Sequence, residues 1–153
     1  MRIDDIRTLK ASTGRLLGVD FGDVRTGLAV SDAARYLSSG LSTISPGSMT
    51  KTADAVAAAA SEHKVSGIIV GLPVNMNGTQ GPRAEHARMF ADMLDERVGD
   101  IPVLLLDERM TTMAASRFLN ETNTRGQKRK QVIDTLSAQI ILQNALDKLK
   151  NIL

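Results

Sequence analysis

Short apolar segments alternate with amphipathic ones along the chain. Two apolar segments, 15–20 and 27–32, are separated by a short turn, and this spacing predicts an antiparallel β-hairpin. Residues 37–44 predict a third, weaker strand. Two further apolar runs, at 67–71 and 101–106, predict buried strands.

Helices are predicted between and after the later strands. Four segments have helical composition or periodicity: 51–64, 82–98, 111–119 and 130–150. The core-facing residues predicted for the second helix are Ala87, Phe90, Leu94 and Val98. Those predicted for the last helix are Ile133, Leu136, Ile140 and Leu146.

This order of elements predicts an α/β fold with a mixed five-stranded sheet. The first three strands are expected to be antiparallel, and the remaining ones parallel with helices on both faces. The length of 153 residues fits one domain over 1–153, with 1–14 as an N-terminal extension.

Composition narrows the chemistry. The chain has no cysteine and two histidines, which excludes a thiolate site and a histidine-rich metal site. Aromatic residues make up 3% of the chain, which argues against exposed aromatic platforms for base stacking. It has no apolar run near the ~18 residues of a membrane span, and its start does not resemble a signal peptide. We therefore expect a cytoplasmic protein with no membrane partner.

Carboxylates follow the predicted strands and carry the most specific signal. Asp20 closes the first strand and Asp107 with Glu108 closes the last, so both can reach the edge where α/β active sites gather. Asp134 lies near the start of the last helix, in line with Ala138 and Ile141. Converging carboxylates without histidine or cysteine form a hard-oxygen site suited to one or two Mg²⁺ or Mn²⁺ ions.

Each acid also has a purely structural explanation. Asp20 could cap a turn, and Asp134 could be favoured by the helix dipole. Asp107 and Glu108 could pair with Arg109 or cap the following helix. The functional interpretation depends on their occurring together.

Other polar residues surround this predicted edge. Arg25, in the glycine-rich turn after the first strand, could hold a phosphate or be a solvated turn residue. Asn75 and Asn77 follow another strand and could contact phosphate or sugar, or form a tight polar turn.

Positive charge is concentrated in one segment. The chain carries a net charge of +2, whereas segment 121–130 alone carries +3, and it lies just before Asp134. Its basic residues are Arg125, Lys128, Arg129 and Lys130. Contact with a phosphate backbone and a solvated linker are the two interpretations, and proximity to the acids favours the first.

Four ordered motifs resemble the RuvX (YqgF) family over about residues 15–147. They are Gly18-x-Asp20-x-Gly22-x-x-Arg25-x-Gly27-x-Ala29-x-Ser31-Asp32, Gly71-Leu72-Pro73-x-x-Met76-x-Gly78-Thr79, Asp107-Glu108-Arg109-x-Thr111-Thr112-x-x-Ala115, and Ile133-Asp134 with Ala138 and Ile141-Leu142-Gln143. Two positions depart from the family pattern: Ser137 stands where alanine is usual, and Ala145 where an aromatic is common.

The resemblance implies an RNase H-like fold and a metal-dependent nuclease. Asp20, Glu108 and Asp134 would be the catalytic acids, with Asp107 a less certain metal ligand. The implied substrate is the 5′ end of pre-16S ribosomal RNA or, alternatively, a Holliday junction in branched DNA. Arg25, Arg109 and the basic segment would hold the nucleic acid, and the protein would act as a monomer or homodimer.

Two other classes of function stay open on the sequence. A non-catalytic nucleic-acid-binding factor in ribosome assembly would keep the fold and the basic segment. A sugar-kinase-like or actin-like ATPase shares the acidic glycine hairpin but needs two lobes, and 153 residues supply one.

Overall fold

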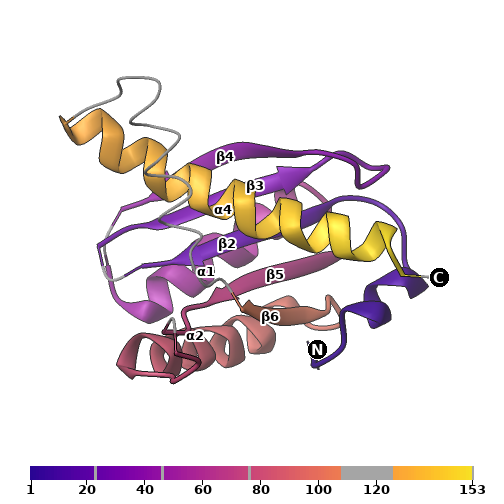
Figure 1. The fold of residues 1–153 in the computed structure, drawn as a ribbon, viewed down its shortest axis with the longest axis horizontal. Helices are drawn as coiled ribbons and strands as arrows, with labels where there is room; N and C mark the ends of the chain where they lie inside the picture. The colour runs from indigo at the N-terminus through magenta and orange to yellow at the C-terminus, as the bar shows by residue number, and fades with distance from the viewer. Residues whose placement is uncertain (23, 46, 76, 108–125, 153) are drawn as a thin grey trace.

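The computed structural model has helices on both faces of one mixed sheet. It describes residues 1–22, 24–45, 47–75, 77–107 and 126–152, with the backbone alone for 126–134. The strands are β1 (Arg2–Ile3), β2 (Leu16–Phe21), β3 (Thr26–Ser31), β4 (Ser38–Ile44), β5 (Gly67–Leu72) and β6 (Val103–Asp107). Their order across the sheet is β1-β6-β5-β2-β3-β4 (Figure 1).

Strand directions agree with the prediction. β2 pairs antiparallel with β3, and β3 antiparallel with β4, so the hairpins form one side of the sheet. β5 lies parallel between β2 and β6. The apolar strands that alternate with helices are therefore the parallel ones, as expected for strands covered on both faces.

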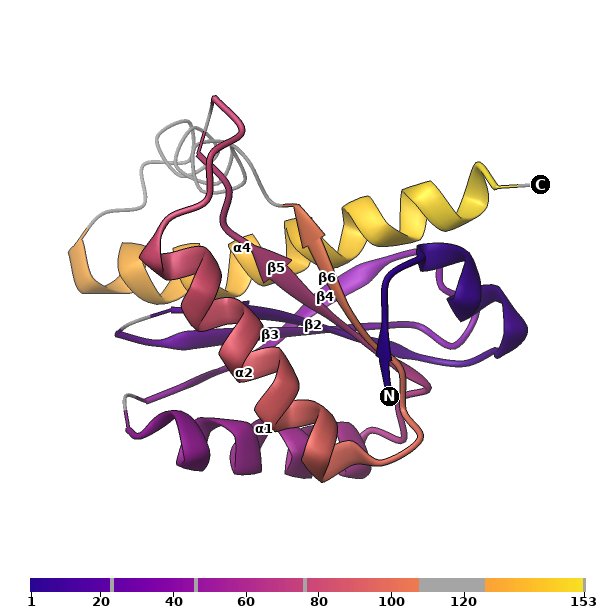
Figure 2. The same cartoon turned by 90° about the horizontal axis from the view of Figure 1, so that it is seen from below.

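Helices α1 (Met49–Glu62) and α2 (Pro82–Val98) cover one face of the sheet (Figure 2). Ser48 caps α1 by accepting a hydrogen bond from the Lys51 N–H at 3.1 Å, and Pro82 begins α2. The core on this face includes Leu17, Val19, Val56, Ile68, Val70, Phe90 and Leu94. Of the predicted α2 face, Ala87, Phe90 and Leu94 are buried and Val98 is half-buried.

Helix α4 (Gly126–Lys150) covers the opposite face, and its contact surface differs from the prediction. Its buried residues are Ser137, Ala138, Ile141, Leu142, Ala145, Leu146 and Leu149. Leu136 and Ile140 are only half-buried, while Leu146 is buried as predicted. The side chain of Ile133 lies outside the described residues. Leu142 and the Ala138 backbone pack directly on Gly18 of β2, and Leu136 and Ile140 lie to the side of this contact.

The N-terminal segment adds a sixth strand, and the predicted count of five was wrong. β1 pairs in parallel with β6, and a 3₁₀ helix, η1 (Ile6–Ala11), follows it. Leu9 of η1 is fully buried and packs with Leu16. Two residues are too short a run to show a strand period, which explains why sequence patterning missed β1.

The remaining helix predictions have different outcomes. α4 begins four residues earlier than predicted, so Lys128, Arg129 and Lys130 belong to its first turns and not to a preceding linker. The helix predicted at 111–119 lies outside the described residues. Within the described part of the chain, no helix has the length and apolar character needed to cross a bilayer.

Candidate nuclease site

Asp20 and Asp107 lie at the same edge of the sheet, where its parallel strands end. Asp20 is the penultimate residue of β2 and Asp107 the last residue of β6. β5 runs between these two strands, so their Cα atoms are separated by two strand spacings, about 10 Å. Both strand-end acids thus lie at one edge of the sheet.

Asp20 faces α4 and lies between glycines of the two neighbouring strands. Successive side chains of β2 point to opposite faces of the sheet. Asp20 is two residues from Gly18 and four from Leu16, so it lies with them on the face that α4 covers. Its partner in β3 is Gly27, and continuing the register of β2 with β5 by one residue places Gly71 on its other side. Because both neighbours lack a side chain, the half-buried Asp20 carboxylate occupies a glycine-lined position on the sheet.

The Asp107 side chain lies on the opposite face of the sheet from that of Asp20. Asp107 pairs with Leu72 of β5. Along β6 it alternates in step with Val103 and Leu105, which pack in the core under α1 and α2. The exposed Asp107 side chain therefore leaves the sheet on the face opposite to Asp20. This geometry separates Asp107 from Asp20 despite their common edge.

Glycines bring α4 close to the sheet beside Asp20. A Cβ atom at Gly18 would lie 2.7 Å from Leu142 Cβ and 2.9 Å from the Ala138 carbonyl oxygen. Asp134 lies one helical turn before Ala138, and the N-terminal end of α4 points toward the edge at which β2 ends (Figures 1 and 2). The backbone of Asp134 is therefore carried toward Asp20, while its side chain lies outside the described residues.

Several predicted site residues are not among those that the structure describes. Glu108, Arg109 and Arg125 lie outside the described residues, as do the side chains of Lys128, Arg129 and Lys130. Among the residues that are described, no three acids or histidines are grouped to hold a metal ion. Of the three predicted catalytic acids, only Asp20 has a described side chain.

The donor chemistry of this edge fits a hard divalent cation better than a soft one. Asp20 offers carboxylate oxygens at a position flanked by glycine in β3, and the chain has no cysteine. Asp20, together with Glu108 and Asp134 from the flanking segments, would be the residues to hold such an ion.

The Asn75 and Asn77 side chains act within their own loop. Asn75 Nδ2 donates to Thr79 Oγ1 at 3.0 Å, and Asn77 Oδ1 accepts from the Thr79 N–H at 3.0 Å and its hydroxyl at 2.6 Å. The Asn75 N–H also donates to the Thr79 carbonyl at 2.8 Å. This network supports the tight-turn interpretation, and the exposed loop still follows β5 at the site edge.

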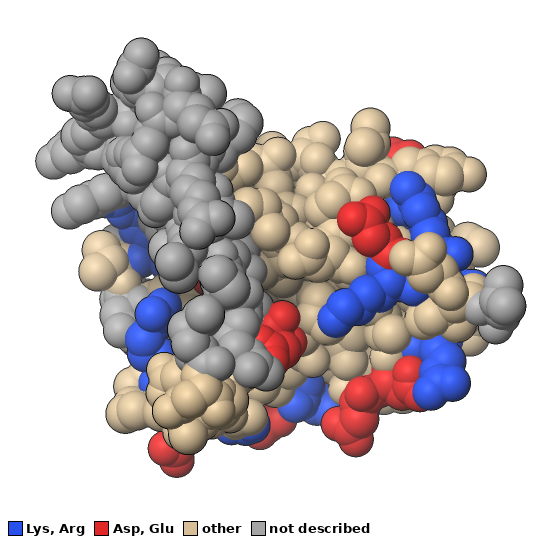
Figure 3. Space-filling view, in the orientation of Figure 1, with Lys and Arg blue, Asp and Glu red and all other residues tan. Residues whose placement is uncertain are grey.

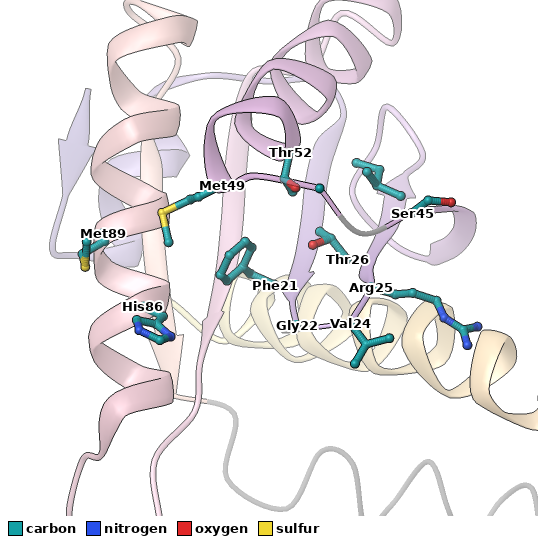
Figure 4. A pocket seen from close by; sticks show the side chains of 12 residues that line it. Phe21, Gly22, Val24, Arg25, Thr26, Ser45, Met49, Thr52, His86 and Met89 are labelled. Atoms are coloured by element: carbon teal, nitrogen blue, oxygen red, sulfur yellow. The ribbon is translucent and has the colours of Figure 1, made fainter.

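Arg25 lies in the β2–β3 turn and borders a cavity on the face away from α4. Gly22 makes this turn possible, because a Cβ at that position would collide with the Arg25 carbonyl oxygen. Arg25 is half-buried and lines the cavity together with Phe21 (Figure 4).

Three residues around this edge were not predicted from sequence. His86 and Met89 from α2 and Thr52 from α1 also line the cavity. His86 is an exposed residue of α2. Its position beside the β2–β3 turn follows from the packing of α2, which no local pattern shows.

Charge on the described surface is mixed. In Figure 3 basic and acidic side chains lie interspersed on the described part of the α4 face, without a broad basic area there. This agrees with a net charge of −1 for the chain without segment 121–130.

Comparison with known sequences gives consistent matches over most of the chain. The model of the RuvX family, described as Holliday junction resolvase, matches residues 14–148. A protein of Myxococcus xanthus named "Putative pre-16S rRNA nuclease" is 44% identical over 133 residues, covering 87% of each chain. One of Cereibacter sphaeroides with the same name is 42% identical over 148 residues, covering 97% of this chain and 92% of the relative.

Comparison with solved structures identifies the fold. RuvC of Thermus thermophilus in complex with a Holliday junction superposes with a TM-score of 0.57 at 11% identity, covering 90% of this chain and 97% of RuvC. The fowlpox virus resolvase in complex with Holliday junction DNA gives a TM-score of 0.51 at 10% identity, covering 88% and 98%. The fold is that of RuvC-like, RNase H-fold nucleases, as predicted from the family motifs.

Proposed function

Because the chain belongs to the RuvX family of nucleases, we propose that it hydrolyses phosphodiester bonds in precursor ribosomal RNA, at the 5′ end of pre-16S rRNA. The observation that carries this proposal is the placement of Asp20. Its carboxylate lies at the carboxyl edge of the parallel strands, between two glycine positions and under the approach of α4. The names of the relatives supply the class of substrate.

We assign the catalytic acids to Asp20, Glu108 and Asp134. Asp20 comes from β2, Glu108 follows β6 directly, and Asp134 comes from α4. The Asp107 side chain takes the other face of the sheet, and for this reason we leave it out of the set. The three acids would hold Mg²⁺ or Mn²⁺, and a bound divalent ion supplies Lewis-acid stabilisation of charge on the phosphate oxygens.

The remaining residues bind and orient the nucleic acid. Arg25 lies in the β2–β3 turn that follows Asp20, and Arg109 follows Glu108 in sequence. The basic residues Arg125, Lys128, Arg129 and Lys130 immediately precede Asp134 in the chain. Their charges would hold the phosphate backbone across the acids without selecting a base sequence.

Replacing Asp20 by Asn tests this assignment. The substitution keeps the size of the side chain and removes its negative charge. We expect cleavage of a pre-16S rRNA fragment in Mg²⁺ or Mn²⁺ to fall by about a hundredfold or more. Gel analysis of the products at neutral pH measures this loss.

The matched control is Asp32→Asn, which makes the same chemical change directly after β3, at the opposite end of the hairpin. This variant should cleave like the wild type. Equal cleavage by the wild type and the Asp20→Asn variant would contradict the proposed mechanism.

Resolution of Holliday junctions is the second candidate, because the matching family model carries that description. Four-way DNA junctions, single strands and precursor rRNA should be compared in one cleavage screen. Preferential cutting of the junction would favour the DNA substrate. Salt-sensitive binding without product under either metal would instead indicate a non-catalytic assembly factor.

A further inference from the structure

A cavity of about 260 Å³ opens directly behind Asp20, on the face of the sheet that α1 and α2 cover. It lies between the β2–β3 turn, the N-terminal part of α1 and the N-terminal half of α2 (Figure 4). Phe21 lines it, and Phe21 follows Asp20 in β2 with its side chain on the opposite face. Asp20 and the cavity therefore share one edge of the sheet.

The wall of the cavity combines three kinds of side chain. Phe21, Met49, Val24 and Met89 supply apolar surface. Hydroxyl groups come from Thr26, Ser45 and Thr52, and the positively charged or titratable groups are Arg25 and His86. In Figure 4 His86 lies on the α2 side of the cavity and Arg25 on the β3 side.

Two of the apolar side chains are unusually exposed. Val24 is 65% and Met89 52% exposed, although both are large hydrophobic residues. Exposed apolar surface beside polar groups is typical of a ligand-binding site. Phe21 is held in place because its ring stacks on Phe90, with centroids 4.4 Å apart.

We propose that this cavity receives one unpaired base of the nucleic-acid strand, from a nucleotide next to the phosphate held at Asp20. This inference rests on the proposed nuclease function. A base has flat apolar faces for Phe21 and the methionines, and a polar edge for the threonine and serine hydroxyls. Its flanking phosphates would lie toward Arg25 and His86.

The size and composition of the cavity favour a single base. Its volume is below the ~300 Å³ at which pockets for larger ligands begin. A recess that encloses one base also needs few aromatic residues, in contrast to a platform that stacks several. The scarcity of aromatic residues in the chain therefore does not exclude this mode of binding.

Binding of short single-stranded oligoribonucleotides tests the proposal in the absence of divalent ions. Each position in turn is made abasic, and affinity is measured by fluorescence anisotropy. The wild type should bind the intact strand about tenfold more tightly than the strand lacking the critical base. Abasic substitution elsewhere should have little effect.

The double variant Val24→Ser with Met89→Ser removes the exposed apolar wall. It should bind the intact strand as weakly as the wild type binds the abasic one, and it should no longer distinguish the two strands. Leu37→Ser is the matched control, since Leu37 is 69% exposed and does not line this cavity. It should retain the wild-type preference.

A second variant keeps the test valid if the double variant fails to fold. Ser45→Phe fills the cavity from an exposed position and should remove the same preference. The proposal is overturned if no abasic position weakens wild-type binding, or if the preference survives in both variants.

Failure of this proposal can be told apart from failure of the nuclease function. Base-dependent binding without cleavage in Mg²⁺ or Mn²⁺ would contradict the proposed nuclease function and support the base-binding role of the cavity. Cleavage that depends on Asp20, without any base dependence of binding, would support the nuclease function and contradict the base-binding role of the cavity.

Discussion

Asp32 is held by the backbone of the turn that follows β3. Its carboxylate accepts hydrogen bonds from the N–H groups of Leu37 at 2.9 Å and Tyr36 at 2.8 Å. The Leu37 N–H is the main cause that lowers the pKa of Asp32 below its ordinary value, and the Tyr36 N–H adds to it. The turn is thus stabilised by the ionised form of this acid.

This gives a pH dependence with a defined sign. The pKa of Asp32 is lower in the folded state than in the unfolded state. Its contribution to the free energy of unfolding is therefore complete above about pH 4, and it is lost as the pH falls through the folded-state pKa. We expect the wild type to lose stability more steeply than Asp32→Asn on acidification below about pH 4. Urea unfolding midpoints measured across this range for both proteins provide the test, and parallel curves would contradict it.

Ser137 is a buried polar residue in the contact surface of α4. It is 0% exposed, and its hydroxyl has no hydrogen-bond partner among the described residues. Replacing Ser137 by Ala should therefore raise the free energy of unfolding by about 1 kcal/mol. Urea denaturation measures the change, and a loss of stability would show that the hydroxyl is satisfied in solution.

At the scale of elements, glycines set the depth at which α4 packs on the sheet. Gly18 meets Ala138 and Leu142, and a Cβ at Gly40 would collide with the Thr135 side chain. The packing of α4 determines where Asp134 stands relative to Asp20. Gly18 is thus a positioning residue for the proposed site.

Gly18→Ala should push α4 away from β2. Overpacking of this kind costs about 1–3 kcal/mol of stability, and the shift should reduce kcat more than it raises KM. Gly81→Ala is the matched control, because a Cβ there meets no atom within 4 Å. An unchanged kcat in a folded Gly18→Ala protein would show that α4 does not position the site.

The elements themselves are largely predictable from local pattern. β2, β3, β5 and α2 appear within one or two residues of the predicted ranges, because long apolar runs and Pro82 are strong local signals. β1 and the contact face of α4 could not be predicted. Both depend on a partner distant in sequence: β6 for β1, and the glycines of the sheet for α4.

At the scale of the whole molecule, the N-terminal segment is tied to the body by Arg35. Its guanidinium donates to the carbonyl oxygens of Leu9 and Gly14, each at 2.7 Å, and to Ser66 Oγ at 2.9 Å. Burial lowers the pKa of Arg35. One side chain thus joins three segments at the end of the sheet opposite to Asp20.

Charge placement is the other whole-molecule property with a consequence for binding. We expect Lys128→Ala with Lys130→Ala to reduce the slope of log K against log salt concentration for single-stranded RNA by about 1.4. Arg15→Ala with Lys148→Ala removes the same charge from exposed positions elsewhere and should leave the slope nearly unchanged. Equal slopes for the two double variants would contradict a role for the basic segment.

The sequence by itself determined the alternation of elements, the family and the acids that follow the strands. These properties are local, because they depend on residue type, period and spacing. Only the tertiary structure decided that Asp20 and Asp107 leave the sheet on opposite faces, that glycines seat α4 beside Asp20, and that a cavity lies behind it. The reason is that the direction of a strand-end side chain and the depth of a helix depend on which surfaces pack together.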